Sequence, residues 1–443
     1  MTASLFQRHA YQQLLRWKNH RKRKPLIMQG ARQVGKTHLL KTFGNKEYES
    51  IVYLNFEEDE DLINIFEQTR NQADLLSNIQ VHINRKIRPE NDLLVLDEIQ
   101  QCSAAISYLK YLNEDHSDLH CIAAGSLLGV KLASEKSFPV GKVDLLHLAP
   151  ITFVQFLTAL KLDELRNYID NINEFTPLPE PFHIKLCDLL KKYIYIGGMP
   201  EAIDSYIESE DYEEVRRVQN NIINTYLLDF AKHAPPHEII RLNQIWNSIP
   251  KQLAKENKKF IFTAVEKSAR AREYEIALEW LVNAALIHKT YHLTAPKLPL
   301  TGYGDTNAFK VYLLDVGLLG ALAHIQPQYL LKPTHLFAEY NGAFTENFVA
   351  QELHAHLLQH LYYWASENRA EVDFIVSYDR EIIPLEVKAN VSTKKRSLRV
   401  YQDKFHPKYC ARSSLLNLKK DGTICNFPLY LLHKFPQLIF HDE

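Results

Sequence analysis

Paired cysteines are the first feature that this sequence lacks. Its five cysteines form no C-x-x-C motif and stand at Cys102, Cys121, Cys187, Cys410 and Cys425. Structural zinc sites and disulfide frameworks both depend on cysteines at short, regular spacings. We therefore expect neither kind of site, and the composition fits a reducing cytoplasm.

Long apolar runs are missing as well. No run reaches the roughly 18 residues that span a bilayer, and the opening residues Met1–Phe6 do not follow the pattern of a signal peptide. The sequence therefore predicts a soluble, cytoplasmic protein without a membrane partner.

An excess of either charge is also absent, because 52 Lys and Arg residues nearly balance 53 Asp and Glu residues. Any affinity for nucleic acid must then come from local patches. The chain does have length and apolar content, with 443 residues of which 46% are hydrophobic. This exceeds what one hydrophobic core usually organises, so we expect two to four domains.

A phosphate-binding pattern occupies residues 26–37, where an apolar segment leads into G-x-x-x-x-G-K-T and then a helix. Gly30 and Gly35 are needed because backbone N–H groups must point inward around the phosphates. We expect Lys36 to neutralise the β- and γ-phosphates of ATP and Thr37 to bind Mg²⁺. The other expected nucleotide contacts are Ala31, Arg32, Gln33 and Val34.

An apolar strand pattern over residues 93–96 ends in two carboxylates. In a nucleotide hydrolase, Asp97 would hold Mg²⁺ through water, and Glu98 would orient and deprotonate the attacking water. The alternative is a core strand that ends in solvated acids. The phosphate-binding pattern upstream favours the catalytic interpretation.

Strand and helix patterns alternate through this region. Strands are expected at residues 51–55 and 120–124, with helices at 36–43 and near 74–86. Such alternation predicts a parallel sheet and an α/β fold. Ser126 follows one of the strands, where it could sense the γ-phosphate or be an ordinary turn serine.

The runs G-A-R-Q-V-G-K-T, L-D-E-I-Q, A-G-S, F-P-V-G-K-V and P-I-T-F resemble the bacterial and archaeal AAA-type ATPases that carry a C-terminal region of the DUF4143 kind. The resemblance covers nearly the whole chain. It implies an AAA-type ATPase core over residues 1–150 and a helical lid over 151–236. The rest divides into a winged-helix-like module, 237–304, and a last domain, 305–443.

Two further positions take their expected roles from this resemblance. Gly198-Met-Pro200 resembles the G-x-P element of signal-transducing ATPases, in which the proline packs against nucleotide, although a plain turn between helices has the same pattern. Lys142 stands where many relatives carry an arginine that could stabilise the transition state.

The winged-helix-like module carries opposing signals for DNA. Arg270 and Arg272 could contact phosphate, whereas Glu273, Glu275 and Glu279 in the same predicted helix would repel it. DNA binding and protein binding both stay open for this module.

A second constellation follows in the last domain. A helix with Glu346 precedes three strands, and Glu386 and Lys388 share a face of the third strand because residues two apart point the same way. This arrangement resembles the PD-(D/E)xK nuclease superfamily. The resemblance implies that Asp373 and Glu386 bind Mg²⁺, that Glu346 adds a ligand through water, and that Lys388 stabilises the developing charge.

The same letters also fit an edge strand with exposed, alternating charges. Two features bear on the choice. Residues 387–420 hold ten Lys or Arg against one Asp, which suits a phosphate backbone. RecB-like nucleases, however, place Gln-x-x-x-Tyr where this chain has Ser397 and Tyr401.

Together these observations predict a Mg²⁺-dependent AAA-type ATPase that binds ATP and ADP and is coupled to a nucleic-acid-binding, nuclease-like domain. The alternative is a regulatory switch, in which nucleotide sets the lid position and the C-terminal domains only bind a partner. An oligomer is compatible with both interpretations.

Overall fold

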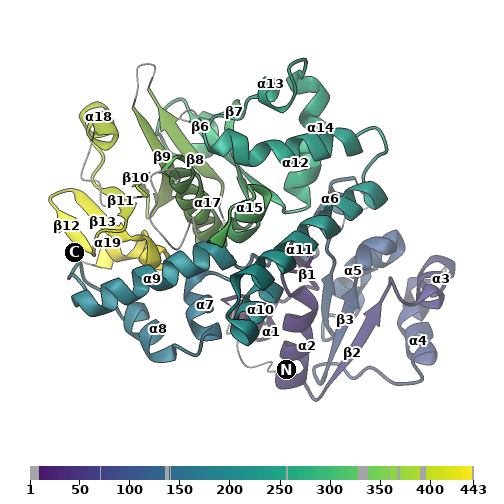
Figure 1. Cartoon of the computed structure of the whole chain (residues 1–443). Coiled ribbons are helices and arrows are strands. Elements are labelled where there is room, and N and C mark those ends of the chain that lie inside the picture. The colour runs from purple at the N-terminus through teal and green to yellow at the C-terminus, as the bar shows by residue number, and fades with distance from the viewer. Residues whose placement is uncertain are drawn as a thin grey trace. The chain divides into compact units, whose positions relative to one another are not determined.

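The computed structural model describes residues 9–69, 71–134, 139, 141–255, 258–327, 338–357, 359–366, 370–389 and 396–441 (Figure 1). The chain forms two compact units. The first contains the residues up to Ala149 together with Asn283–Ala285, and the second contains Pro150–Val282 and the residues from Leu286 onward.

The first unit is built on a five-stranded sheet in the order β2-β3-β4-β1-β5. Every neighbouring pair is parallel. The strands are β1 (Leu26–Gln29), β2 (Ser50–Asn55), β3 (Asp92–Asp97), β4 (His120–Ala124) and β5 (Asp144–His147). The predicted parallel α/β sheet is thus confirmed, and β1 and β3 end at the same edge of the sheet because all its strands run the same way.

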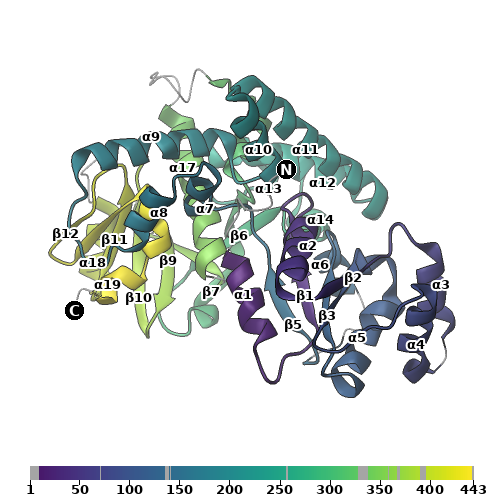
Figure 2. The ribbon, with the colours of Figure 1, turned by 90° about the horizontal axis from the view of Figure 1, so that it is seen from below.

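Helices precede and connect these strands. They are α1 (His9–Lys18), α2 (Lys36–Glu47), α3 (Glu60–Gln68), α4 (Gln72–His82), the short η1 (Ile99–Gln101), α5 (Ser103–Asp115) and α6 (Leu128–Ser134). Figures 1 and 2 show α3 and α4 side by side. Within the described ranges, no helix combines the length and the apolar character that a membrane crossing requires.

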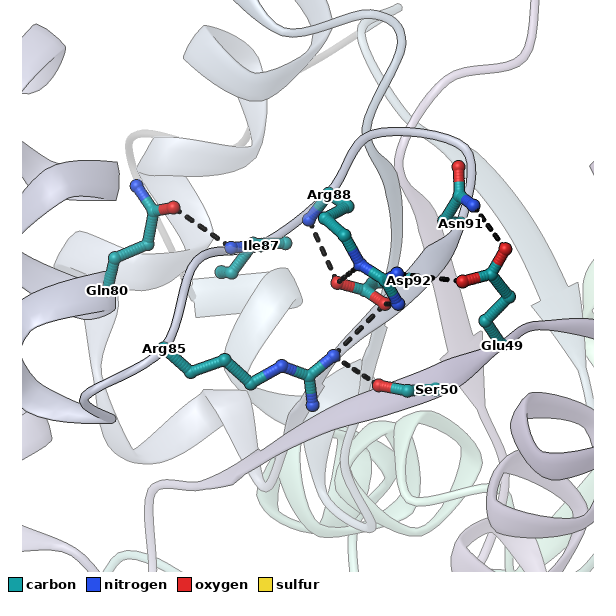
Figure 3. Close-up of polar contacts among 8 residues, drawn as sticks. All are labelled: Glu49, Ser50, Gln80, Arg85, Ile87, Arg88, Asn91 and Asp92. Atoms are coloured by element: carbon teal, nitrogen blue, oxygen red, sulfur yellow. Dashed lines mark hydrogen bonds and ion pairs between the residues drawn. The ribbon is translucent and has the colours of Figure 1, made fainter.

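Buried charge fixes the start of β3 (Figure 3). Asp92 is fully buried and accepts hydrogen bonds from the backbone N–H of Arg88 over 2.9 Å and from its guanidinium over 2.7 Å. Arg85 lies 3.0 Å from the same carboxylate, and Arg88 also pairs with Glu49 over 2.7 Å. These contacts join the loop before β3 to the segment that enters β2.

The second unit begins with helices. They are α7 (Phe153–Ala159), α8 (Asp163–Asp170), α9 (Glu180–Ile196), α10 (Pro200–Ser209), α11 (Tyr212–His233), α12 (Ile239–Leu253), α13 (Phe262–Val265) and α14 (Ala271–Asn283). Later helical segments are η2 (Leu300–Tyr303), α15 (Val316–Leu322), α17 (Ala338–Leu357), α18 (Arg396–Phe405), η4 (Leu429–Lys434) and α19 (Gln437–His441).

An eight-stranded mixed sheet forms the core of this unit, in the order β12-β13-β11-β10-β9-β8-β6-β7. Its strands are β6 (Ile287–Leu293), β7 (Gly304–Leu313), β8 (Leu361–Ala365), β9 (Glu371–Tyr378), β10 (Glu381–Val387), β11 (Cys410–Ser414), β12 (Lys419–Asp421) and β13 (Ile424–Pro428). β9 is antiparallel to both β8 and β10, whereas β10 and β11 are parallel.

This sheet runs across a boundary that the sequence suggested. β6 lies inside the predicted winged-helix-like module, yet it pairs with β7 on one side and with β8 on the other. Residues 237–304 and 305–443 therefore share one sheet, and the four-part division of the chain stays a prediction.

The predicted lid helices pack against the C-terminal segment. α9 lies beside η4, where His183 Nδ1 and the hydroxyl of Tyr430 are 2.7 Å apart. The backbone N–H of Leu178 also donates to Asn417 Oδ1 over 3.0 Å. Residues 151–236 thus belong to the same compact unit as the eight-stranded sheet.

Candidate functional sites

The phosphate-loop pattern lies between β1 and α2. Gly35 has φ 90° and ψ 29° directly before the first residue of α2, a left-handed conformation that favours glycine. A Cβ on Gly30 would lie only 2.5 Å from the backbone oxygen of Leu148. Both positions therefore need glycine, and α2 begins where the positive end of a helix can face an anion.

Lys36 lies inside its own loop. Its Nζ donates to the carbonyl oxygens of Gly30 and Ala31, each over 2.9 Å, and the residue is only 6% exposed. Burial lowers the pKa of Lys36 to about 8, against the opposing effect of Glu98 and Asp97. A bound phosphate would compete with the two carbonyls for the same ammonium hydrogens.

The other loop residues have distinct surroundings. Ala31 and Val34 are buried in the protein, and Gln33 has a left-handed φ of 65°. Arg32 lies close enough to Lys36 that its charge contributes to the lowered pKa of that lysine. The loop thus presents backbone and basic side chains to the site, while its apolar side chains face the core.

Asp97 connects the loop to β3. Its Oδ2 accepts a hydrogen bond from Thr37 Oγ1 over 3.0 Å and another from the hydroxyl of Tyr53, and its Oδ1 accepts from the backbone N–H of Glu98 over 3.0 Å. Asp97 is 3% exposed, so these donors stabilise the carboxylate in a position where bulk water cannot. Burial and the hydrogen bond to Asp97 together raise the pKa of Tyr53.

Glu98 is held by two side chains. Its Oε2 accepts from Gln100 Nε2 and, over 3.3 Å, from Ser126 Oγ. A Cβ on Gly125 would lie 1.9 Å from Gln100 Oε1, so glycine at that position lets Gln100 approach. The structure therefore brings Ser126 to the predicted catalytic base.

Lys142 forms an ion pair with Glu114 over 2.7 Å within the first unit. A hydrogen bond from Lys142 holds the pKa of Glu114 below its usual value. Both side chains are more than a third exposed, which makes this a weak surface pair.

Pro200 is the first residue of α10, in the second unit. The preceding glycines contact Asp315, which is fully buried and accepts from the backbone N–H of Gly198 over 2.5 Å. A Cβ on Gly197 would lie 2.2 Å from Asp315 Oδ1. Burial raises the pKa of Asp315 to about 6, although backbone hydrogen bonds oppose the shift. A contact of Pro200 with nucleotide stays a prediction.

A chain of hydrogen bonds connects this turn to α17. Gln351 Oε1 accepts from the backbone N–H of Val316 over 2.9 Å, and its Nε2 donates to the hydroxyl of Tyr193 over 2.9 Å. Tyr193 donates to the carbonyl of Ile151, whose own N–H donates to the carbonyl of Gly198 over 2.7 Å. The G-x-P turn is thus fixed to the helix that carries Glu346.

The nuclease-like residues gather on one face of the eight-stranded sheet. Leu385 pairs with Phe374 in the β9–β10 ladder, so Asp373 and Glu386 lie opposite each other one step further along. Asp373 Oδ2 accepts from the backbone N–H of Val387 over 2.7 Å, and Glu386 Oε1 lies 3.0 Å from Lys388 Nζ. Glu386 Oε2 is buried without a hydrogen-bond partner among the described residues.

Glu346 reaches this face from α17, but lysines already bind it. Lys258 Nζ pairs with its Oε1, and Lys310 Nζ lies 3.8 Å from its Oε2. The hydroxyl of Tyr312 donates to Oε2 over 3.2 Å. Both carboxylate oxygens of the predicted water-mediated metal ligand therefore contact donors from the protein.

The charges on this face affect one another. Burial and the nearby carboxylate of Glu346 raise the pKa of Asp373 to about 7, although Lys310 opposes the shift. Burial would lower the pKa of Lys388, but Glu386 and Asp373 raise it overall. Across the described ranges, no three or more Asp, Glu, His and Cys side chains form a group that could hold a metal ion. Binding of Mg²⁺ by Glu346, Asp373 and Glu386 stays a prediction.

Several basic side chains of residues 387–420 reach the surface. Those described as exposed are Arg399, Lys404, Lys408, Lys419 and Lys420. Lys394 and Lys395 lie outside the described residues. Arg270 and Arg272, in the region of α14, are exposed too, together with the glutamates of the same helix.

Sequence reasoning missed five residues of these sites: Tyr53, Gln100, Lys258, Lys310 and Asp315. Two of them carried a usable signal. Lys310 lies within the apolar stretch Phe309–Leu314, where a buried lysine requires a carboxylate partner, and Asp315 directly precedes a short apolar helix that it caps. The contacts of the other three depend on tertiary packing.

Three family models match parts of the chain. Residues 22–157 match the family described as an AAA domain. Residues 187–329 match a domain of unknown function, DUF8612, and residues 341–432 match another, DUF4143. The chain thus contains a region that matches an AAA domain, mostly in the first unit, and a C-terminal region that matches DUF4143. Both were predicted from the sequence.

Solved structures show distant likenesses. A Walker-type ATPase of Pyrococcus abyssi is 14% identical and matches 72% of this chain and 96% of its own, with a TM-score of 0.46. The ORC1 protein of Aeropyrum pernix, in complex with DNA, is 15% identical. That match covers 73% of this chain and 94% of the other, with a TM-score of 0.32.

A signal transduction ATPase with numerous domains and a tetratricopeptide repeat sensor, from Pyrococcus horikoshii, is 13% identical. The match covers 80% of this chain and 47% of that one, with a TM-score of 0.27. No curated protein matches the chain. TM-scores below 0.5 leave these structures too distant to indicate a shared function.

Proposed function

We propose that this protein is a Mg²⁺-dependent ATPase that hydrolyses ATP at the phosphate loop of the first unit. The hydrogen bond between Thr37 and Asp97 is the main support, since it joins the end of the loop to the carboxylate that follows the apolar strand. Lys36 directly precedes Thr37, and Glu98 directly follows Asp97. The charge of Glu98 also acts on Lys36, whose pKa it raises against the effect of burial.

Each residue has a distinct role in this proposal. Lys36 leaves the two loop carbonyls and contacts the β- and γ-phosphates. Glu98 orients the attacking water and takes its proton, while Gln100 and Ser126 fix the direction of its carboxylate. Ser126 responds to the γ-phosphate only through Glu98 in this proposal.

The residues present fit a magnesium ion. Thr37 Oγ1 and Asp97 Oδ2 are oxygen donors 3.0 Å apart, and Mg²⁺ is usually bound by one or two such protein groups together with phosphates and water. Thr37 would bind the ion directly and Asp97 through water. When bound, the ion neutralises charge on the phosphates.

The second unit, in this proposal, binds nucleic acid through the exposed basic residues from α18 to β12. Their positive charge suits a phosphate backbone, and binding would release counterions. Replacing Arg399, Lys404 and Lys408 with Ala should weaken binding and flatten its salt dependence. A control triple, Lys185, Lys251 and Lys255 to Ala, removes the same charge from exposed positions elsewhere in the unit and should bind normally.

A switch is the second candidate, and two observations favour it. Lys36 and Glu98 are both held by groups of the protein, so the site must rearrange before it can act on ATP. In the second unit, the turn before Pro200 is fixed to Asp315 and α17, so a change at the turn would move the C-terminal part as well.

ATP hydrolysis by the full chain, measured with and without DNA, separates the two candidates. A processing enzyme should turn over continuously and faster with DNA. A switch should turn over slowly, retain ADP through purification and lose that ADP when Pro200 is replaced with Ala. Equal affinity for ATP and ADP would count against the switch, because equal affinities shift no equilibrium.

A further inference from the structure

Seven charged residues lie together on the face of the eight-stranded sheet that contacts α17. We call this group the ionic cluster; its members are Glu346, Glu371, Asp373 and Glu386, together with Lys258, Lys310 and Lys388. They come from α17, β7, β9, β10, the turn after β10 and the segment before α13. The predicted metal ligands are three of these seven residues.

Lys310 is the most buried basic member of the cluster. Its side chain is 0% exposed, and its Nζ pairs with Glu371 and lies 3.8 Å from Glu346 Oε2. A buried ammonium group is tolerated only where ionised partners compensate the loss of water. Lys310 and these carboxylates therefore require one another in the folded protein.

Lys258 approaches the same helix from another segment. Its Nζ pairs with Glu346 Oε1, and its side chain is 12% exposed. Together, Lys258 and Lys310 contact both oxygens of Glu346, which Tyr312 also contacts. A magnesium ion demands near-ideal octahedral oxygen ligation, so it could use Glu346 only after displacing these donors.

The charge balance agrees with these contacts. When all members are ionised, four carboxylates and three ammonium groups leave a single negative charge. Arg412 adds a further positive charge beside the cluster, because it is buried and is the register partner of Glu386 in the β10–β11 ladder. The lysines thus provide the neutralisation that a divalent cation would otherwise supply.

We propose that Lys258 and Lys310 replace the metal ion of the nuclease-like site. The DUF4143 domain then binds its partner without a divalent cation and does not cleave nucleic acid. Among the carboxylate oxygens of the ionic cluster, Glu386 Oε2 is the one that is buried without a described hydrogen-bond partner. One oxygen does not provide enough ligands for a metal site. This proposal does not depend on ATP hydrolysis by the first unit.

Manganese binding tests the proposal on the full chain. The Lys36→Ala background, prepared free of nucleotide, removes metal that ATP would bring to the first unit. Free Mn²⁺ is then measured by electron paramagnetic resonance, with and without Glu386→Gln. We expect no Mn²⁺ bound at the cluster, and hence equal curves. Binding that disappears with Glu386→Gln would overturn the proposal.

A gain of binding provides the positive arm. Lys310→Met leaves neighbouring carboxylates uncompensated, so the variant should melt at a lower temperature than the parent. Mn²⁺ should restore part of the lost melting temperature, because the vacated cluster can now hold the cation. If Lys310→Met does not fold, Lys258→Met, whose lysine is less buried, serves for the same measurement.

Lys289→Met is the matched control. Lys289 is a lysine of the same sheet, 9% exposed, and it pairs with Glu279 outside the cluster. The control should lose some stability, and Mn²⁺ should not restore it. A folded Lys310→Met or Lys258→Met variant that Mn²⁺ fails to stabilise would contradict the proposal, since the free carboxylates should then accept the ion.

Discussion

The hydroxyl of Thr37 donates a hydrogen bond to Asp97 Oδ2 over 3.0 Å, between residues that are 60 positions apart in the chain. Neither residue alone identifies a nucleotide site. Their contact supports the proposal of such a site, because it places a hydroxyl and a carboxylate beside the start of α2, where a helix attracts anions. The ATPase proposal rests on this relationship.

Lys36→Ala is expected to abolish tight ATP binding. The lysine is the buried ammonium group of the loop, and no other buried cation is described there. Isothermal titration with ATP and Mg²⁺ measures the effect. Lys46→Ala is the control, because Lys46 is exposed in the last turn of the same helix, about 15 Å along its axis. Equal ATP affinity in both variants would contradict the assigned role.

Ser126→Ala should slow ATP hydrolysis about tenfold, which corresponds to about 1.4 kcal/mol in the barrier. The reason is the hydrogen bond to Glu98, which directs the carboxylate without binding the substrate. The value of kcat should therefore fall while KM for ATP stays unchanged. Ser77→Ala, at an exposed position of α4, should behave as wild type. A raised KM with normal kcat would assign Ser126 to substrate binding instead.

Asp92→Asn should lower the free energy of unfolding by about 2 kcal/mol at neutral pH, since the buried carboxylate accepts charged hydrogen bonds. Burial raises the pKa of Asp92, but Arg88 lowers it further, so the net pKa lies below the usual value. The stabilisation is consequently present at neutral pH and is lost as the pH falls below about 4.

Unfolding of wild type and Asp92→Asn, followed by circular dichroism across this pH range, checks the sign. The two curves should converge in acid. Asp188→Asn provides the control, because Asp188 forms only an exposed pair with Lys191 and should contribute little at any pH. A difference that grows as the pH falls would show that the ionised form of Asp92 is not the stabilising one.

Gly197→Ala should destabilise the protein more than Gly422→Ala does. Both glycines have positive φ, 77° and 60°, so each substitution carries a backbone cost of about 1–3 kcal/mol, and Gly197, with ψ −170°, lies in a region that is essentially restricted to glycine. Only at Gly197 would the added Cβ also meet a neighbour, Asp315, whereas Gly422 has open space around it. Melting temperatures of the two variants measure the difference, and equal shifts would mean that the turn can move away from Asp315.

The sequence predicted the elements whose signals are local. Residues 93–96 form a wholly apolar run before two acids, and the structure has β3 there. The predicted strand at residues 120–124 coincides with β4. Short apolar runs and glycine positions are properties of a few neighbouring residues, so these elements could be predicted from the sequence alone.

Contacts between distant segments could not be predicted from the sequence. Lys258 and Glu346 are 88 positions apart, and their pairing follows from the packing of α17 against the segment before α13. Thr290 and Leu361, whose pairing joins β6 to β8, are also far apart in the chain. These long-range contacts show that residues predicted as two modules share one sheet.

Steady-state ATP hydrolysis by wild type and Glu98→Gln, in the presence and absence of Mg²⁺, tests the central claim most directly. The account predicts Mg²⁺-dependent turnover by the wild type, and a Glu98→Gln variant that still binds ATP in equilibrium titration but no longer hydrolyses it. Hydrolysis by Glu98→Gln at the wild-type rate would contradict the assignment of the catalytic base and, with it, the proposed site.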